Sequence, residues 1–304
     1  MTQRLSPATA VLLTVPPLMW AGNAVVGQLV QNLIGPMALN FLRWLLAFAI
    51  LLPLAPWVLR RASPMWPQWR HFALLGLLGV GAYNALLYLA LHTSSPVNVT
   101  LVGASAPLWT LLIGARFFRA SVTAMQLLGA LLSIAGVAVV LARGELALLL
   151  RLQLVPGDLL VMLAAIAWAW YSWLLALRKE APEIRSDWAA MLIAQVAIGL
   201  VWAGLFAGAE WTLSDPPIHW GWPLACALLY VAVGPSLLAY RCWGVGVQRS
   251  GPTLAGFFSN LTPLFAALMS AAFLGELPKP YHALAFALIV AGILVSARSS
   301  KKGV

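Results

Sequence analysis

The sequence predicts an all-α integral membrane protein whose ten transmembrane helices form two inverted five-helix repeats around a central cavity. The first observation is composition: 62% of the 304 residues are hydrophobic and 9% are charged, whereas soluble domains carry about a quarter charged residues. The second is that apolar runs of about 20 residues, long enough for a helix to cross a hydrocarbon core of ~30 Å, recur from end to end. The third is that the two halves of the sequence resemble each other.

Ten apolar segments are separated by glycine, proline and charged residues, which favour turns and loops. The first shows no obvious cleavage site, so we interpret it as a transmembrane helix rather than a signal peptide. A polar interval at 207–221 separates the seventh segment from the eighth, and the eighth contains Pro235 and Arg241. The predicted spans are 8–31, 36–59, 71–93, 96–118, 122–142, 157–178, 187–207, 222–247, 252–274 and 281–297.

The repeat is visible in residues that constrain the backbone. A shift of 156 residues relates Pro96 to Pro252 and Pro107 to Pro263. Five spans is an odd number, so the second copy must enter the membrane in the opposite orientation. We therefore expect residues 1–150 to form the first repeat and residues 151–304 the second, inverted one. Such repeats are typical of secondary carriers, whose substrate site lies near the membrane midplane between them.

Membrane topology explains the net charge of +10 better than nucleic-acid binding does, because the cations lie in short groups between apolar runs rather than on one basic face. With the N-terminus in the cytoplasm, fourteen of the eighteen cations, Arg241 included, fall on the cytoplasmic side. Three fall on the other side, and Arg43 lies within the second span. Because cytoplasmic loops are enriched in lysine and arginine, we expect both termini to be cytoplasmic.

Six short motifs in the two halves resemble one known family. They are Trp20-Ala21-Gly22-Asn23, Asn40-Phe41-Leu42-Arg43, Ser105-Ala106-Pro107-Leu108, Asn260-Leu261-Thr262-Pro263-Leu264, Phe273-Leu274-Gly275-Glu276 and Ala291-Gly292-Ile293. They resemble those of the drug/metabolite transporter superfamily, specifically its ten-helix EamA-type exporters, over nearly the whole chain. The resemblance implies a bacterial inner-membrane exporter, most like the aromatic and neutral amino-acid exporters. One departure is Arg119-Ala120 after the fourth span, where members of the family often have Gly-Glu.

Polar and aromatic side chains near the middle of spans one, three, six, eight and nine are the candidate substrate-binding residues. They are Trp20, Asn23, Tyr83, Asn84, Trp168, Tyr171, Tyr240 and Asn260. Amide and hydroxyl groups need partners in hydrocarbon, and aromatic rings can stack on an apolar substrate side chain. For each residue the alternative is a helix–helix hydrogen bond or anchoring at the membrane interface. We expect several of these spans to contribute to one pocket for a small molecule such as an amino acid.

Two prolines and two arginines add to this candidate site. Pro107 and Pro263 interrupt their helices at matching positions, which indicates a central site or a gating role. A plain kink needed for packing is an equally simple explanation. Arg43 is a charge contact for substrate if it faces a cavity, whereas a purely structural role places its guanidinium at the external surface or on helix-end carbonyls. Arg241 meets a substrate carboxylate if the eighth span is continuous, and otherwise lies at the cytoplasmic end.

The acidic residues argue against tight proton coupling. All eight lie in predicted loops or at span ends, whereas a proton relay normally uses a carboxylate within the membrane. We therefore expect uniport or exchange by alternating access.

Neither a catalytic motif nor a metal or cofactor motif is present in the sequence. The chain is thus predicted to be no enzyme, with membrane lipid and a small-molecule substrate as its partners. An exporter of drugs or other amphiphilic metabolites is the alternative within the same class. An intramembrane enzyme or a scaffold subunit is the alternative of a different class, and the sequence leaves the oligomeric state open.

Overall fold

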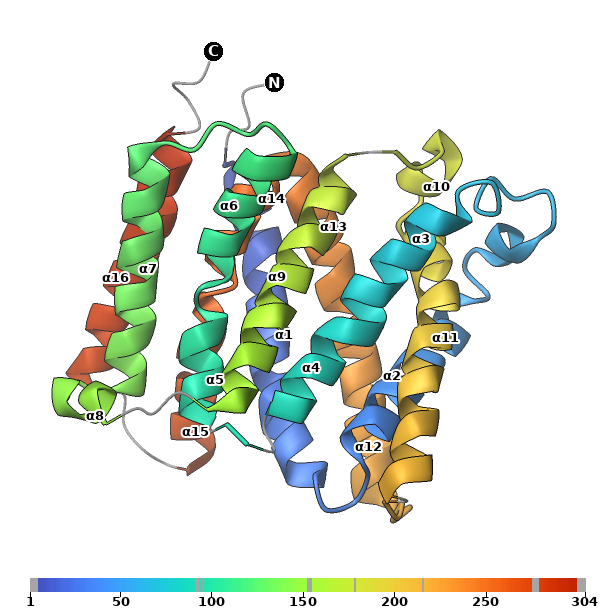
Figure 1. Ribbon diagram of the computed structural model, residues 1–304, viewed down its shortest axis with the longest axis horizontal. Helices are drawn as coiled ribbons and strands as arrows, with labels where there is room; N and C mark the ends of the chain where they lie inside the picture. Colours follow the sequence, from blue (N-terminus) through green and yellow to red (C-terminus); the bar gives the residue numbers. More distant parts are fainter. Residues whose placement is uncertain are drawn as a thin grey trace.

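The computed structural model describes residues 5–90, 93–94, 96–151, 155–177, 179–214, 216–274 and 279–299. Helices account for the regular structure of these residues and run between two ends of a bundle (Figure 1). We call the end at which α1 begins and α16 ends the terminal end, and the other the opposite end. Gly275 and Glu276, from one of the motifs above, lie outside the described residues.

The first half crosses the bundle five times, and two crossings consist of more than one helical segment. In chain order they are α1 (Pro7–Val30), α2 (Pro36–Leu51), α3 (Trp69–Gly76) continued by the π-helical η2 (Leu77–Ala82) and α4 (Tyr83–Ala90), α5 (Pro96–Gly103) with α6 (Ala106–Phe117), and α7 (Ala124–Leu141). The short 3-10 helix η1 (Pro56–Leu59) follows α2.

The second half repeats this arrangement after the short α8 (Leu146–Leu150). Its crossings are α9 (Pro156–Ala176), α11 (Trp188–Ser214), α12 (Trp222–Val231) continued by the π-helical η3 (Ala232–Leu238) and α13 (Ala239–Ser250), α14 (Pro252–Phe258) with α15 (Leu261–Leu274), and α16 (Pro280–Ser299). The short α10 (Pro182–Ser186) connects α9 to α11. Within the described residues nine stretches are long and apolar enough to span a membrane, and α2, with 16 residues, is the shorter tenth.

Two predicted boundaries are wrong. The second span does not continue to residue 59, because α2 ends at Leu51 and the two prolines that follow, Pro53 and Pro56, cannot continue a helix. The seventh span does not end at residue 207, because α11 continues to Ser214. This extension places Glu210 where its carboxylate accepts hydrogen bonds from the N–H groups of Met37 and Ala38 at 3.0 and 2.9 Å, which caps the beginning of α2.

Helix packing follows the two-repeat pattern. The first helix of one half packs on the third and fourth crossings of the other: α1 contacts α13 and α15, and α9 contacts α4 and α6. The second crossings, α2 and α11, pack together, as do the fifth crossings, α7 and α16 (Figure 1). These reciprocal contacts are those of two inverted repeats around a pseudo-two-fold axis. The predicted fold class is confirmed, while the division at residues 150 and 151 stays a prediction.

Irregular helix turns also recur at matching positions. The π-helical η2 at 77–82 corresponds, after the shift of 156 residues, to 233–238 within η3. Each half also has a break before its proline, at 104–105 before Pro107 and at 259–260 before Pro263. At both breaks a serine hydroxyl, of Ser105 or Ser259, donates to the carbonyl oxygen three residues upstream.

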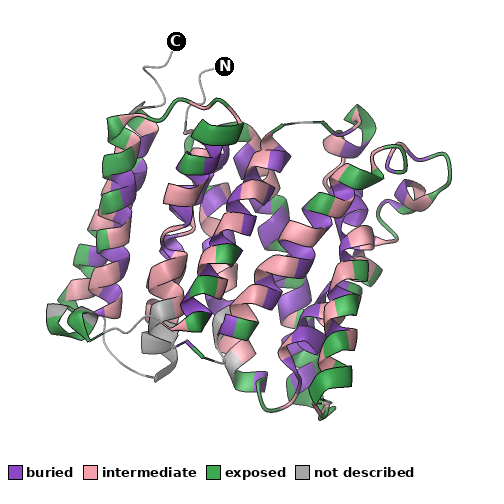
Figure 2. Cartoon of the chain, in the orientation of Figure 1, coloured by how far each residue is buried: buried purple, intermediate pink, exposed green. Residues whose placement is uncertain are grey.

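Burial separates the interior of the bundle from its outer surface. Buried residues gather where helices face each other, and exposed ones lie on the outside and at the two ends (Figure 2). Large apolar side chains on the outside, such as Leu131 and Leu205, are more than half exposed. In a membrane protein this surface is covered by lipid.

Candidate functional site

A cavity of about 700 Å³ lies at the terminal end of the bundle, between α1, α9, α10, α11 and α13. Tyr171, Gln195 and Tyr240 form its floor, because each is the lining residue furthest from the terminal end on its own helix. The Tyr171 hydroxyl donates to Gln195 Oε1 at 3.0 Å. The other lining residues are Ser6, Thr9, Leu175, Arg185, Ser186, Trp188, Met191, Leu192, Arg241, Gly244, Val245, Gln248 and Arg249.

Behind this floor, aromatic rings from both halves pack around Trp168. Its ring centroid lies 4.8–5.6 Å from those of five neighbours, and the Trp20 ring stands perpendicular to it. Edge-to-face and tilted pairs at such distances are favourable arrangements for aromatic rings. The aromatic cluster consists of Trp20, Tyr83, Trp168, Tyr171, Tyr240 and Trp243.

Four polar groups of the aromatic cluster, including the Tyr171 hydroxyl, have protein partners, whereas the Trp168 N–H does not. The Tyr240 hydroxyl donates to the Gly79 carbonyl of η2, and Trp20 Nε1 donates to the Pro235 carbonyl of η3 at 3.3 Å. Trp243 Nε1 donates to Ser172 Oγ at 3.2 Å. Trp168 Nε1 is buried and has no hydrogen-bond partner among the described residues. An unpaired buried N–H is unusual, so this group is available to a bound molecule.

Gly79 allows the two tyrosines of the floor to approach η2. A Cβ atom at this position would lie 2.8 Å from the Tyr171 ring, closer than side chains pack. The absence of a side chain therefore lets the Tyr171 ring lie against η2, next to the Gly79 carbonyl that accepts from Tyr240. The role of Gly79 is therefore one of packing.

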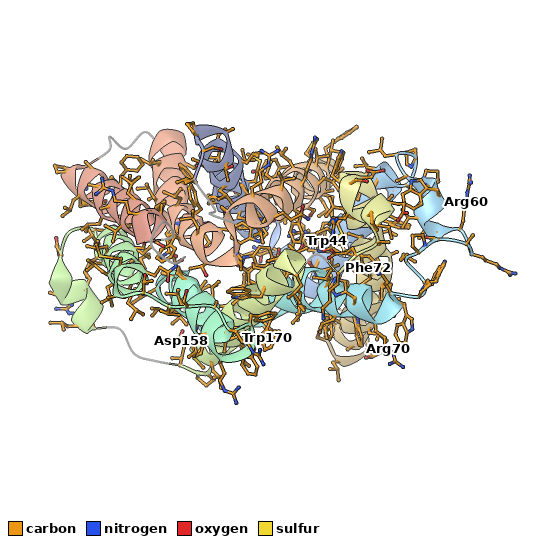
Figure 3. The ribbon with its side chains drawn as sticks, turned by 90° about the horizontal axis from the view of Figure 1, so that it is seen from above. Trp44, Arg60, Arg70, Phe72, Asp158 and Trp170 are labelled. Carbon is orange, nitrogen blue, oxygen red and sulfur yellow. The ribbon has the colours of Figure 1, made fainter. Side chains whose placement is uncertain are left out.

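Arg43 is fully inside the bundle. The residue is 1% exposed, its Nε donates to Ser236 Oγ at 3.0 Å and its Nη1 donates to Asn23 Oδ1 at 3.3 Å. The neighbouring Trp44, also inside the bundle (Figure 3), packs edge-on against Tyr240 with ring centroids 4.9 Å apart. The interpretation in which Arg43 reaches the external surface is wrong, because α11 and η3 cover this part of α2.

The eight predicted binding residues face the interior of the bundle. Five of them belong to the aromatic cluster, and Asn23 pairs with Arg43. Asn84 is buried in α4, and Asn260 is buried at the break between α14 and α15, with its Nδ2 lacking a partner in the described part of the chain. Only Tyr171 and Tyr240 of the eight line the cavity. A substrate contact for any of them stays a prediction.

Arg241 lies on α13 and lines the cavity at the terminal end. The eighth crossing is a continuous helical stretch from Trp222 to Ser250, so Arg241 lies within it rather than in a loop. Its guanidinium carbon lies 4.4 Å from the centre of the Trp188 ring, and both residues line the cavity. Pro235 does not end this helix because η3 accommodates it with a wider turn.

Sequence reasoning missed Trp243 and the residues of the cavity wall. Trp243 follows Tyr240 by three residues and therefore lies on the same helix face. The same spacing drew attention to Trp168 and Tyr171, so it could have found Trp243. Gln195 carries no comparable signal, because its role depends on the position of Tyr171 on another helix.

Buried acidic groups in the described residues lie at helix ends. Glu180, after α9, pairs with His71 at 2.9 Å. Asp158, labelled in Figure 3, accepts from the Ser94 hydroxyl and, at 2.9 Å, from the Val155 N–H, which caps α9. Asp215 and Glu276 lie outside the described residues. These contacts fix loops to helix ends and leave the cavity lining without an acidic residue in the described part of the chain.

Comparisons with known proteins agree with this architecture. The model of the EamA-like transporter family matches the chain twice, at residues 8–142 and 155–298. An uncharacterized transporter of Bacillus subtilis (strain 168), YyaM, is 28% identical over 74% of this chain and 72% of its own length. The aromatic amino acid exporter YddG of Ancylobacter novellus is 27% identical over 76% of each chain. A solved crystal structure covers 98% of this chain and 99% of its own with a TM-score of 0.74 at 23% identity, which shows the same fold.

Proposed function

The chain belongs to the EamA-like transporter family, and we propose that it exports aromatic and neutral amino acids by alternating access. Membership makes it an integral membrane transporter of small molecules. The observation that carries the substrate proposal is the position of the aromatic cluster, directly behind the floor of the cavity and with an unpaired Trp168 N–H. A relative that is named as an aromatic amino acid exporter supports the same substrate class.

The cavity has the chemistry that an amino-acid substrate requires. Its volume of about 700 Å³ is within the range of about 300–1,000 Å³ for small-molecule pockets. Three arginines, Arg185, Arg241 and Arg249, line its wall, and the described lining residues include no acidic one. This charge favours a molecule that carries a carboxylate over a purely cationic one. The tyrosine rings of the floor offer an apolar surface to its side chain.

The proposed direction follows from topology. Most of the described lysines and arginines lie at the terminal end, so the positive-inside tendency supports a cytoplasmic terminal end. The cavity would then load substrate from the cytoplasm. Uniport or exchange is proposed because the described acidic groups bind helix ends and loops instead of facing this cavity.

Counterflow in liposomes tests the substrate class and the absence of coupling together. Purified protein is reconstituted with unlabelled phenylalanine inside, and uptake of labelled phenylalanine is measured with equal pH and sodium on both sides. We expect saturable uptake that external tryptophan and leucine inhibit and that glutamate and lysine leave unchanged. Uptake that needs an imposed gradient would contradict uniport and exchange, and inhibition by amphiphilic dyes alone would favour the alternative exporter of drugs.

Trp168 variants test the role of the aromatic cluster in the same assay. Trp168→Ala removes the central ring and is expected to weaken phenylalanine binding by ~1 kcal/mol or more, whereas Trp168→Phe keeps a ring and is expected to retain much of it. Trp66→Phe, at a loop tryptophan that is 46% exposed, is the matched control and should leave uptake unchanged. Melting temperatures identify variants with a fold defect. Equal uptake by wild type and Trp168→Ala would exclude the aromatic cluster from substrate binding.

A further inference from the structure

We propose that Arg43, Asn23 and Ser236 form a carboxylate-binding site behind the aromatic cluster, and that this site makes a carboxylate a requirement for substrate recognition. The proposal rests on the proposed function, because it assigns a second binding site to the same substrate. It adds a second arginine location, outside the lining of the cavity.

Arg43 is a buried cation whose hydrogen-bond partners are neutral. The residue is 1% exposed and hydrogen-bonds to the side-chain oxygens of Ser236 and Asn23. Arg43 has no carboxylate partner within 4.0 Å among the described residues. A buried charge without a counter-ion is destabilising. Binding of an anion would therefore be favourable at this point.

The three residues lie about one helical turn behind the aromatic cluster. Ser236 precedes Tyr240 by four residues on the crossing that runs toward the terminal end, so it lies deeper than the cavity floor. Asn23 follows Trp20 by three residues on α1, which runs away from the terminal end. Both helices thus place the Arg43 site on the far side of the rings from the cavity. A substrate that crosses the aromatic cluster would meet Arg43 next.

The groups present fit a carboxylate. A guanidinium has five N–H donors in a planar fork that matches the two oxygens of a carboxylate, and two of its nitrogens already hold Ser236 and Asn23. Since Asn23 Oδ1 accepts from Arg43, the amide Nδ2 of Asn23 is left as a further donor. Charge-assisted bidentate hydrogen bonds are strong and directional. The zwitterion of an amino acid supplies this carboxylate, and its side chain would stay against the aromatic cluster.

Paired ligands that differ only in charge test the site by binding rather than by transport. Indole-3-propionate and indole-3-propionamide are titrated against wild type, Arg43→Lys and Arg43→Gln, with thermal stabilisation in detergent as the readout at fixed chloride. We expect wild type to bind the carboxylate more tightly than the amide. Arg43→Gln should weaken carboxylate binding about tenfold or more and leave amide binding unchanged, with Arg43→Lys in between because it keeps the charge and loses the fork.

The matched control for Arg43→Gln is a variant at an exposed arginine. Arg70→Gln makes the same change at an exposed arginine that stacks on Trp69 and should change neither affinity. Equal losses for both ligands in the Arg43 variants would assign Arg43 a structural role and overturn the proposal. If both variants fail to fold, wild type decides: equal affinity for the two ligands overturns the proposal. A carboxylate preference that depends on Arg43 in a protein without amino-acid counterflow would keep the site and reject the amino-acid substrate.

Discussion

Three unpaired polar atoms of the protein interior lie on α2 and α9, two helices whose side chains contact or belong to the aromatic cluster. Trp168 Nε1, Trp44 Nε1 and Asn40 Oδ1 lack a hydrogen-bond partner among the described residues. Trp44 touches Tyr240, and Asn40 donates through its Nδ2 to the Val80 carbonyl of η2. An unsatisfied buried group costs about 1–3 kcal/mol. In a transporter this cost is acceptable where a substrate, a water molecule or a second conformation supplies the missing partner.

Arg119 has a backbone conformation that is unfavourable for a residue with a Cβ atom. It has a φ of 54°, the left-handed conformation that favours glycine, and the following Ala120 N–H donates to the Gly114 carbonyl at 3.0 Å to close α6. This is the position where the sequence departs from the Gly-Glu often found in the family it resembles. The conformation gives a physical reason for a glycine there.

Arg119→Gly is therefore expected to stabilise the protein by about 1 kcal/mol, because a residue with a Cβ atom is strained in this conformation. The measurement is thermal unfolding in detergent, where the midpoint should rise. Arg116→Gly is the control, since Arg116 is exposed and helical and a glycine there should lower stability by a similar amount. A midpoint that falls for both variants would show that the strain at Arg119 is negligible.

Residue spacing predicted part of the site. Side chains three residues apart, such as Trp168 and Tyr171, were expected on one helix face, and the structure brings both into the aromatic cluster. Residue spacing could not predict the cavity, because the cavity depends on how the ends of five helices separate at the terminal end. Hydropathy does not report that separation, so Gln195 and Trp188 gave no signal.

At the scale of elements, side chains of each half form hydrogen bonds to the π-helical turn of the other half. The side chain of Tyr240, in the second half, donates to the Gly79 carbonyl of η2. In the reciprocal contact, Trp20 of the first half donates to the Pro235 carbonyl of η3. A π turn adds a residue to a helix and shifts its hydrogen-bond ladder, which makes carbonyl groups available to side chains. Such turns suit positions where helices must adopt a second arrangement.

Tyr240→Phe tests this contact because it deletes the hydroxyl and keeps the ring. A typical intramolecular hydrogen bond stabilises by about 0.5–1.5 kcal/mol, so its loss should lower the population of the state with the cavity at the terminal end several-fold. The probe is Gly244→Cys, because the wall has room for a side chain there, in a background without Cys226 and Cys242. We expect slower thiol labelling of the probe in detergent.

Tyr281→Phe, which makes the same change on α16 outside the aromatic cluster, should leave labelling of Gly244→Cys unchanged. If Tyr240→Phe also leaves the labelling rate unchanged, the hydrogen bond between the halves does not select this conformation.

Elements were predicted well where hydropathy and helix breakers agree. All ten crossings correspond to predicted spans, and the breaks before Pro107 and Pro263 follow from the missing proline N–H. The extension of α11 beyond residue 207 was missed because its last turns are polar and are held by the contact of Glu210 with α2. The π turns were missed because one extra residue in a helix does not change the hydropathy pattern of a continuous apolar segment.

At the scale of the whole molecule, the symmetry of the repeats and the distribution of cations both support a transporter with two inverted halves. Repeat-related helices pack in reciprocal pairs, which is the arrangement that permits one repeat to rock against the other. The cavity lies at the terminal end of this symmetric framework, the end that carries most of the described cations. The position of the cavity depends on how the helices separate at that end, which the sequence could not predict.

The orientation of the whole molecule in the membrane is the remaining prediction, and two single cysteines test it. His219 lies in the connection between α11 and α12 at the opposite end, Ser121 lies between α6 and α7 at the terminal end, and both are exposed. In a background without Cys226 and Cys242, a membrane-impermeant thiol reagent added to intact cells should modify His219→Cys and leave Ser121→Cys unmodified. Permeabilised cells provide the control, because both positions should then react. The reverse pattern in intact cells would place the terminal end outside, so the cavity would face the cell exterior and the proposed direction of export would be wrong even if counterflow of amino acids were observed.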